Sequence, residues 1–170
     1  MKKIDITVHN NFHKQTNKTY KALSLILKWA PIASLFALDF IDKQPKDKRM
    51  EHFIDVVAAE LLLQATVQPL KYIVKRVRPN GDSESFPSAH TATSFLGSEL
   101  LRKNYKDTYP LLNYASYAVA IGAGALRLYQ NKHWLSDVFA GAVLGAAAVE
   151  LSPRLMDAII EKVNIEPAVY

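Results

Sequence analysis

Long apolar stretches alternate with short polar segments along the whole chain. Within these stretches the apolar residues do not follow the strict alternation of a strand, and Gly and Pro fall mostly between them, which is typical of helices. No segment has a convincing strand pattern. We therefore expect an all-α fold, a helical bundle of about five core helices. The expected helices are approximately Ala22 to Ile41, Glu51 to Val77, Ser88 to Arg102, Pro110 to Arg127 and His133 to Glu150.

Prolines and the ends of the chain modify this pattern. Pro31 and Pro69 lie inside the first two expected helices and should bend them. A short amphipathic tail helix is expected after Pro153. Residues 1–20 form a polar N-terminal segment that lacks the continuous apolar region of a signal peptide. The length fits a single domain that covers residues 1–170.

The apolar helices are expected to be embedded in a membrane. Several approach the length that crosses about 30 Å of hydrocarbon, although the helix from Ser88 to Arg102 is too short and too polar. Gly141-x-x-x-Gly145 has the spacing that membrane helices use for close packing, and aromatic residues lie near segment ends. The mean hydropathy is only −0.03, however, and small residues also mark helix contacts in soluble bundles. A tightly packed soluble bundle therefore stays open as an alternative.

The distribution of cations predicts an orientation in that membrane. If the helices alternate in direction, Asp42 to Met50, Lys103 to Tyr109 and the C-terminal tail share one face. That face is rich in Lys and Arg, so the positive-inside rule places it in the cytoplasm and the opposite loops outside. Lysines before the first helix count against this orientation, unless that segment lies along the membrane surface. They are Lys2, Lys3, Lys14, Lys18 and Lys21.

Charge and residue types narrow the range of partners. A net charge of +5 and a pI near 9.3 favour anionic partners. No basic stripe is interleaved with aromatic residues, so nucleic acid is not expected as a partner. The absence of Cys excludes disulfides, thiolate nucleophiles and Cys-type zinc sites.

Polar residues outside the candidate motifs are assigned to structure or to the surface. His9, His13 and His52 have no carboxylate cluster at metal-ligand spacing around them, so we expect them at the surface and expect no metal cofactor. Asp55 and Glu60 lie within an apolar helix, where hydrogen bonding in the core is a better explanation than catalysis.

Lys71 and Arg78 are the first candidate site residues. Their spacing puts them two turns apart on one face of a helix that Pro79 ends. Two cations there are able to hold a phosphate, Arg78 by a forked pair of hydrogen bonds and Lys71 as a point charge. The alternative is a solvated basic helix end that interacts with its own macrodipole.

Pro87-Ser88-Ala89-His90 is the second candidate motif. Ser88 suits an N-cap, and the free backbone N–H groups of the helix that follows make an anion site. His90 would lie in the first turn, where its imidazole is able to donate a proton to a leaving oxygen. An ordinary Ser cap with an incidental His is the alternative.

His133 and Asp137 form the third motif with Arg127. Their i, i+4 spacing lets the carboxylate accept the Nδ1 proton of His133 and present Nε2 as a nucleophile. Arg127 precedes them across a short loop and supplies a further cation for phosphoryl oxygens. A solvent-exposed His–Asp pair on a helix is the alternative.

The order of these motifs resembles the type 2 phosphatidic acid phosphatase superfamily, in its bacterial membrane lipid phosphatase branch. Lys71-x6-Arg78-Pro79, Pro87-Ser88-Ala89-His90 and Arg127-x5-His133-x3-Asp137 are similar to its three signature motifs, within residues 71–137. The resemblance implies a hydrolase without a cofactor, in which His133 attacks phosphorus to form a phosphohistidine, Asp137 orients it and His90 protonates the leaving group. By the same resemblance the phosphate-binding residues are Lys71, Arg78, Ser88, Ala89 and Arg127.

This sequence departs from the family pattern at two positions. Ala89 stands where Gly is usual, and its backbone N–H remains able to bind phosphate. Leu126 stands where Ser usually precedes the third-motif Arg, which removes a hydroxyl contact. Similar lipid phosphatases commonly have six membrane spans, whereas this chain has a polar N-terminal segment in place of the first.

The resemblance and the apolar helices together predict a membrane lipid phosphatase. Its expected substrates are phosphomonoesters or pyrophosphates on lipids, such as undecaprenyl pyrophosphate, phosphatidylglycerophosphate, phosphatidic acid or lipid A. We expect a multi-pass protein of the inner (cytoplasmic) membrane with its active site facing the periplasm or cell exterior. The alternatives are a soluble non-specific acid phosphatase of the same superfamily, a non-catalytic lipid-binding helical protein and, more distantly, a vanadate-dependent haloperoxidase.

Overall fold

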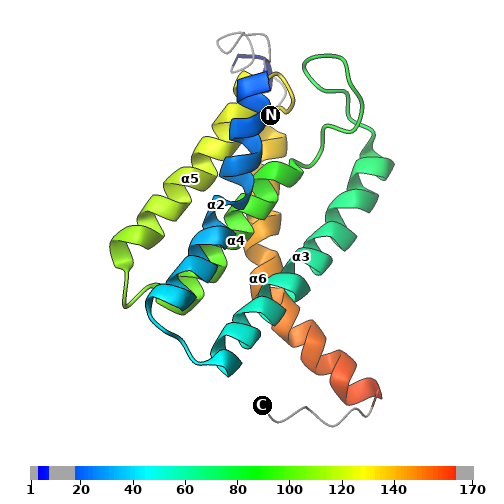
Figure 1. Cartoon of the computed structure of the whole chain (residues 1–170). Helices are drawn as coiled ribbons and strands as arrows, with labels where there is room; N and C mark the ends of the chain where they lie inside the picture. Colours follow the sequence, from blue (N-terminus) through cyan, green and yellow to red (C-terminus); the bar gives the residue numbers. More distant parts are fainter. Residues whose placement is uncertain (1–3, 8–17, 164–170) are drawn as a thin grey trace.

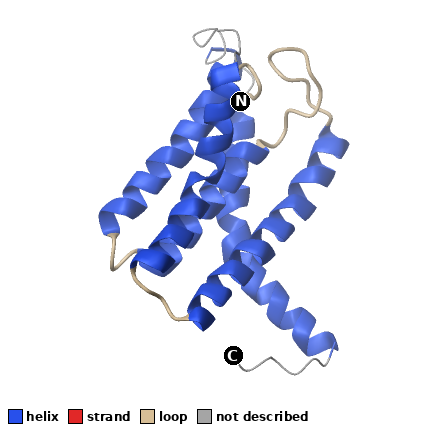
Figure 2. Cartoon of the chain, in the orientation of Figure 1, coloured by secondary structure: helices blue, strands red, loops and turns tan. Residues whose placement is uncertain are grey.

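The computed structural model describes residues 4–7 and 18–163, and over these ranges the chain is a bundle of five long helices (Figure 1). No strand occurs in the described part of the chain, where loops and turns join the helices (Figure 2). The expected all-α class is confirmed. Residues 4–7 form one additional helical turn. The long helices are α2 (Lys18–Ile41), α3 (Lys46–Val74), α4 (Ala89–Tyr105), α5 (Pro110–Tyr129) and α6 (Leu135–Val163).

Helix α4 lies at the centre of the bundle and packs against the four other long helices. It approaches α6 closely because Gly141 and Gly145 face its backbone. A Cβ atom at Gly145 would lie 2.1 Å from the carbonyl oxygen of Ala92, and one at Gly141 would lie 2.5 Å from that of Ser88. The Gly-x-x-x-Gly spacing is thus a close-packing face, as predicted, and it places the second and third turns of α6 against the first turn of α4.

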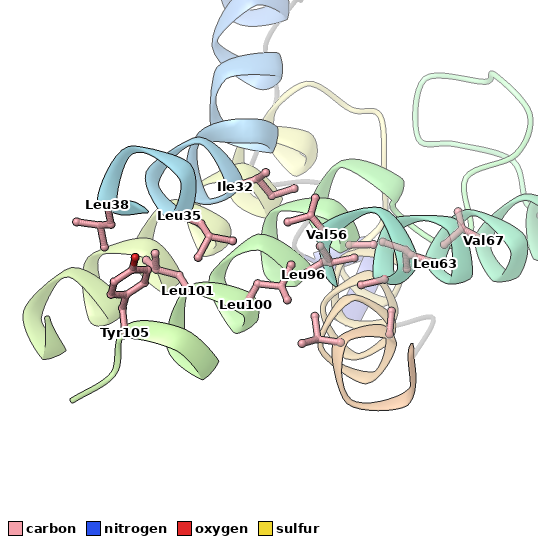
Figure 3. Close-up of a cluster of buried hydrophobic side chains, with 14 residues drawn as sticks. Ile32, Leu35, Leu38, Val56, Leu63, Val67, Leu96, Leu100, Leu101 and Tyr105 are labelled. Carbon is pink, nitrogen blue, oxygen red and sulfur yellow. The ribbon is translucent and has the colours of Figure 1, made fainter. Parts of the chain in front are cut away.

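The apolar core lies between α2, α3, α4 and α6 (Figure 3). Leu35, Leu63 and Leu96 are fully buried there, one from each of the first three helices. Removing one such side chain from water contributes about 2 kcal/mol. This core holds the helix ends that carry the candidate site in fixed positions.

A polar cluster is buried at the end of the bundle that is remote from the candidate motifs. The Nδ1 atom of His52 lies 2.7 Å from Asp39 Oδ1, and the Tyr105 hydroxyl donates to the same oxygen at 2.7 Å. His52 is 2% exposed, so its expected surface position is wrong, because it pairs with a carboxylate on the neighbouring helix α2. His9 and His13 lie outside the described residues.

Asp55 and Glu60 both form hydrogen bonds, but only the bonds of Glu60 are partly buried, whereas the pair of Asp55 with Lys103 is exposed and not in the core as expected. Glu60 accepts from Gln64 at 2.7 Å and from Thr93 of α4 at 3.1 Å. Asp55 pairs with Lys103 of α4 at 3.1 Å. Both carboxylates therefore link α3 to α4.

Prolines inside helices free carbonyl groups that other side chains then bind. Pro31 has no N–H for the carbonyl of Leu27, and Ser94 of α4 donates to that carbonyl at 2.8 Å. Pro153 likewise frees the carbonyl of Val149, which lies 3.5 Å from the Ser152 hydroxyl. Helix α6 continues through Pro153 to Val163, so the prediction of a separate tail helix is wrong.

Three of the described helices, α2, α3 and α6, are long and apolar enough to cross a membrane. Their outer faces carry large apolar side chains that no other helix covers, among them Ile26, Leu61 and Phe139. Uncovered apolar surface of this extent fits contact with lipid better than contact with water. The length and apolar composition of these three helices indicate that the chain is a membrane protein.

Candidate active site

The residues of the three sequence motifs meet at one end of the bundle, the upper end in Figure 1. Helices α3 and α5 finish there and helices α4 and α6 begin there. The charges of Lys71, Arg127 and Asp137 lie close enough to interact. In chain order the residues are Lys71 in the last turn of α3, Arg78 in the following loop, Ser88, Ala89 and His90 at the start of α4, Arg127 in the last turn of α5, and His133 and Asp137 around the start of α6.

The loop between α3 and α4 carries Arg78. Helix α3 ends at Val74, where Lys75 adopts a left-handed conformation and its N–H bonds the carbonyl of Lys71. Arg78 is therefore not on the helix that carries Lys71, and the expectation that both lie on one helix face is wrong. The loop still brings the two cations together, because Lys71 Nζ and an Arg78 Nη donate to the same carbonyl oxygen of Glu84, at 2.8 and 3.4 Å.

Ser88 occupies the N-cap position of α4, as predicted, but its side chain does not cap the helix. Its hydroxyl and that of Thr91 instead lie 2.9 Å apart, and its backbone N–H donates to the carbonyl of Asp137 at 3.0 Å. The Ser88 hydroxyl therefore does not occupy the first N–H groups of α4, and free N–H groups at a helix start are able to bind an anion. Ala89, the first residue of the helix, packs partly against the core.

His133 is held by a backbone carbonyl rather than by Asp137. It lies two residues before α6, so the helical i, i+4 geometry does not apply, and its Nδ1 is 3.8 Å from Asp137 Oδ2. Nδ1 lies 2.7 Å from the carbonyl oxygen of Ser85. Since a carbonyl only accepts, Nδ1 carries the proton and Nε2 has the free lone pair in the neutral ring. The expected hydrogen bond between Nδ1 and Asp137 is not formed. The ring nevertheless has the expected tautomer, with its proton on Nδ1.

Asp137 organises the chain around His133. Its Oδ2 accepts the backbone N–H of Trp134 at 2.8 Å and a short hydrogen bond from the Ser85 hydroxyl. Asp137 is the third residue of α6, and its carboxylate thus caps the backbone N–H of the N-cap residue, Trp134. Because the Ser85 carbonyl binds His133 while the Ser85 hydroxyl binds Asp137, one residue couples the carboxylate to the imidazole.

Arg76 is a member of this cluster that the sequence motifs did not single out. One of its terminal nitrogens donates to Asp137 Oδ1 at 2.8 Å and to Ser136 Oγ at 2.6 Å. The other donates to Asp5 Oδ2 at 2.8 Å. The sequence signal that could have identified Arg76 was its position two residues before Arg78. Ser85 and Asp5 had none, since their contacts join parts of the chain far apart in sequence.

Contacts from α2 position Arg127. Its guanidinium donates to Gln130 Oε1 at 2.7 Å and to Ser24 Oγ at 3.3 Å. Gln130 is fixed in turn, because its amide donates to the Tyr20 carbonyl at 2.7 Å. Helix α2 therefore supports the third cation of the site, although its sequence carries none of the three motifs.

Burial and the surrounding cations lower the pKa of both histidines. The pKa of His133 falls to about 4, mainly through burial, with Arg127 and Lys71 adding to the effect and Asp137 opposing it. The pKa of His90 falls to about 3, again mainly through burial, followed by the charges of Arg127 and Lys28. Both rings are neutral near pH 7, which suits a nucleophile at His133. His90 needs the negative charge of a phosphate among the same cations before it can act as an acid.

Comparison with known proteins defines the family. Residues 53–161 match the sequence pattern of the PAP2 superfamily. The chain belongs to this superfamily. The matched range contains all eight residues that the sequence motifs assigned to the site.

A lipid A 1-phosphatase supports this assignment. The chain is 38% identical over 99 residues to a lipid A 1-phosphatase of Porphyromonas gingivalis, a match that covers 58% of this chain and 22% of that protein. The chain thus spans about a fifth of this curated PAP2 relative.

Groups of three or more His, Cys, Asp or Glu that could hold a metal ion do not occur among residues 4–7 and 18–163.

Two crystal structures share the PAP2 fold seen here. The structure of Aquifex aeolicus LpxE has a TM-score of 0.68 at 22% identity, and the match covers 89% of this chain and 93% of that one. The first transmembrane PAP2 type phosphatidylglycerolphosphate phosphatase from Bacillus subtilis has a TM-score of 0.62 at 19% identity, covering 93% and 87%. At these identities the likeness concerns the arrangement of the helices.

Proposed function

We propose that the chain is a metal-independent phosphatase that removes phosphate from a lipid through a phosphohistidine intermediate. The observation that carries the proposal is the setting of His133. Its ring is buried, its Nδ1 faces the Ser85 carbonyl at 2.7 Å, and its Nε2 is free for attack within reach of the charges of Lys71 and Arg127.

The reaction follows from these positions in two steps. His133 Nε2 attacks phosphorus, the N–P bond forms as the P–O bond to the lipid breaks, and His90 gives its proton to the leaving oxygen. Water then attacks the phosphohistidine, His90 takes a proton from that water, and the N–P bond breaks to release phosphate. Lys71, Arg78, Arg127 and the first N–H groups of α4, beginning at Ala89, stabilise the phosphoryl oxygens in both steps.

The lipid nature of the substrate is supported by the outside of the bundle and by relatives. Helices α2, α3 and α6 are able to cross a membrane, and the named relatives act on lipid A and on phosphatidylglycerolphosphate. Lipid A, phosphatidylglycerophosphate, phosphatidic acid and undecaprenyl pyrophosphate are therefore the first substrates to test. A soluble acid phosphatase would not need the uncovered apolar faces of these helices.

The same reasoning extends to location. We propose a multi-pass protein of the cytoplasmic membrane whose single domain covers residues 1–170 and whose site faces the periplasm or cell exterior. The end remote from the site carries a cluster of cations, which favours the cytoplasm for that end. The cluster consists of Lys43, Lys46, Lys48, Arg49, Lys103 and Lys106.

The test is phosphate release by the purified protein in detergent. Wild type and His133→Ala are compared on a panel of the four lipid phosphates and on p-nitrophenyl phosphate, a soluble ester. We expect release from at least one lipid and a fall of at least about a thousandfold in His133→Ala, as for the loss of other catalytic nucleophiles. Asp55→Asn, at the Lys103 ion pair remote from the site, is the matched control and should keep wild-type activity.

Two outcomes would contradict parts of the proposal. Equal release by wild type and His133→Ala would exclude His133 as the nucleophile. Hydrolysis of p-nitrophenyl phosphate without release from any lipid would favour the non-specific acid phosphatase instead.

A further inference from the structure

The helical turn at residues 4–7 lies against the start of α6, beside the candidate active site. Asp5, in this turn, is 4% exposed and places its carboxylate on two groups of Ser136. Asp5 Oδ1 accepts the backbone N–H of Ser136 at 3.0 Å, and Oδ2 accepts its hydroxyl at 2.8 Å. Oδ2 also accepts from Arg76 at 2.8 Å. No step of the proposed reaction uses Asp5, so its burial needs another explanation.

Asp5 is ionised in this position. Burial raises its pKa, but the N–H of Ser136, the guanidinium of Arg76 and the Ser136 hydroxyl outweigh burial and leave the pKa below its ordinary value. A buried carboxylate is retained only where such partners compensate for its lost hydration. Asp5 is therefore a built part of the cluster and not a surface residue that happens to face it.

Arg76 connects Asp5 to the carboxylate of Asp137. Its guanidinium binds Asp137 through one nitrogen and Asp5 through the other, each at 2.8 Å. The guanidinium also lies over the indole ring of Trp134, 5.6 Å from the ring centre. Two carboxylates, the Ser136 hydroxyl and one aromatic face thus hold the guanidinium, and Asp5 is the carboxylate that anchors its second terminal nitrogen.

The same contacts continue to the nucleophile. Asp137, held by Arg76, accepts the Ser85 hydroxyl, and the Ser85 carbonyl accepts Nδ1–H of His133. We propose that Asp5 is a positioning residue that, through Arg76, keeps Asp137 and Ser85 in place to orient His133. This inference rests on the proposed function, in which His133 is the nucleophile. It makes the turn at residues 4–7, which lies outside the matched family range, a functional part of the active site.

A purely structural role predicts a different result from a positioning role. If Asp5 only caps α6, its loss lowers stability and leaves the turnover of the folded enzyme unchanged. If Asp5 positions the nucleophile, kcat falls in protein that is still folded, while KM, which reflects the phosphate-binding cations, changes little.

The experiment compares Asp5→Asn, Asp5→Ala and Asp5→Glu with wild type on the best lipid phosphate of the panel. Asp5→Asn keeps a side-chain oxygen for the Ser136 N–H and removes the charge that binds Arg76. We expect its kcat to fall about tenfold to a hundredfold with KM within about twofold, as for residues that orient a catalytic group. Asp5→Ala should lose at least as much and Asp5→Glu should recover part of the rate. Asp55→Asn, which removes a paired carboxylate at the other end of the bundle, is the matched control and should keep wild-type kcat.

Coupling to Arg76 is tested by a double-mutant cycle. Because Asp5 acts through Arg76, Asp5→Asn should cost much less in an Arg76→Gln background than in wild type. Independent, additive losses would overturn the proposed route. Unchanged kcat in all three Asp5 variants, or losses that match the fraction of unfolded protein, would overturn the positioning role itself.

A second measurement does not depend on turnover. In protein with ¹⁵N-labelled histidine, NMR should show the wild-type His133 as a single tautomer protonated at Nδ1, and Asp5→Asn should show a mixture of tautomers. Unchanged imidazole signals in Asp5→Asn would overturn the inference even if the substrate assignment fails. Conversely, phosphate release that does not depend on His133 would contradict the proposed function. The imidazole signals of His133 would still show whether Asp5 orients the ring.

Discussion

At the scale of single residues, His90 and His133 share one field of cations but need opposite protonation states. Burial and the charge of Arg127 lower the pKa of both rings. His133 benefits directly, because a neutral ring with its proton at Nδ1 presents Nε2 for attack. His90 becomes an acid only when a phosphate dianion offsets the cations around it. The substrate therefore supplies part of the electrostatics that its own cleavage requires.

The lowered pKa of His133 predicts activity that persists into acid. Protonation of His133 removes the nucleophile, so kcat/KM should fall as the pH drops through about 4, the pKa of the buried ring, and not through the ordinary value near 6.5. The measurement is kcat/KM from pH 3.5 to 8 on p-nitrophenyl phosphate, divided at each pH by the fraction of substrate present as the dianion, because a phosphate monoester itself titrates at about pH 6. Circular dichroism at each pH confirms folding. His90→Ala should keep this acid limb, because p-nitrophenolate leaves without a proton donor. An acid limb near 6.5 in both proteins would contradict the assignment.

At the scale of elements, the site depends on where helices end and on how prolines are accommodated inside them. Helix α3 stops at Val74, which frees the loop that carries Arg76 and Arg78. Helix α2 continues through Pro31 because Ser94 of α4 binds the carbonyl that the proline leaves without an N–H. This contact joins the helix that supports Arg127 to the helix that carries His90.

Ser94→Ala tests the contribution of this contact. The change leaves the partly buried Leu27 carbonyl without this donor and should lower the free energy of unfolding by about 1–3 kcal/mol. Thermal or denaturant unfolding in detergent measures the loss. In a Pro31→Ala background the N–H of residue 31 is able to bind Leu27, so the same Ser94→Ala change should cost less. Equal costs in the two backgrounds would show that Ser94 acts in another way.

At the scale of the whole molecule, the sequence predicted contacts that depend on local spacing and missed those that depend on the path of the chain. Apolar periodicity was sufficient for the five helices and the all-α class, and Gly141 and Gly145 marked the α4–α6 contact. The i, i+4 spacing suggested a hydrogen bond between His133 and Asp137 that does not form, because α6 begins at Leu135. The Ser85 carbonyl that replaces it carries no signal in the sequence, since every residue has a carbonyl.

The orientation of the whole bundle is the last prediction. The α3–α4 loop at the site end should face the periplasm or cell exterior and the α4–α5 loop should face the cytoplasm, where the cluster of cations lies. The chain has no Cys, so single-Cys variants are free of background. Ser83→Cys and Asp107→Cys place one thiol at an exposed position in each loop. A membrane-impermeant maleimide applied to intact cells whose outer barrier is permeabilised should label the Ser83→Cys variant, whereas the Asp107→Cys variant should need lysis. The reverse pattern would place the site in the cytoplasm and would mean that the lysines at the site end, such as Lys18 and Lys21, decide the orientation.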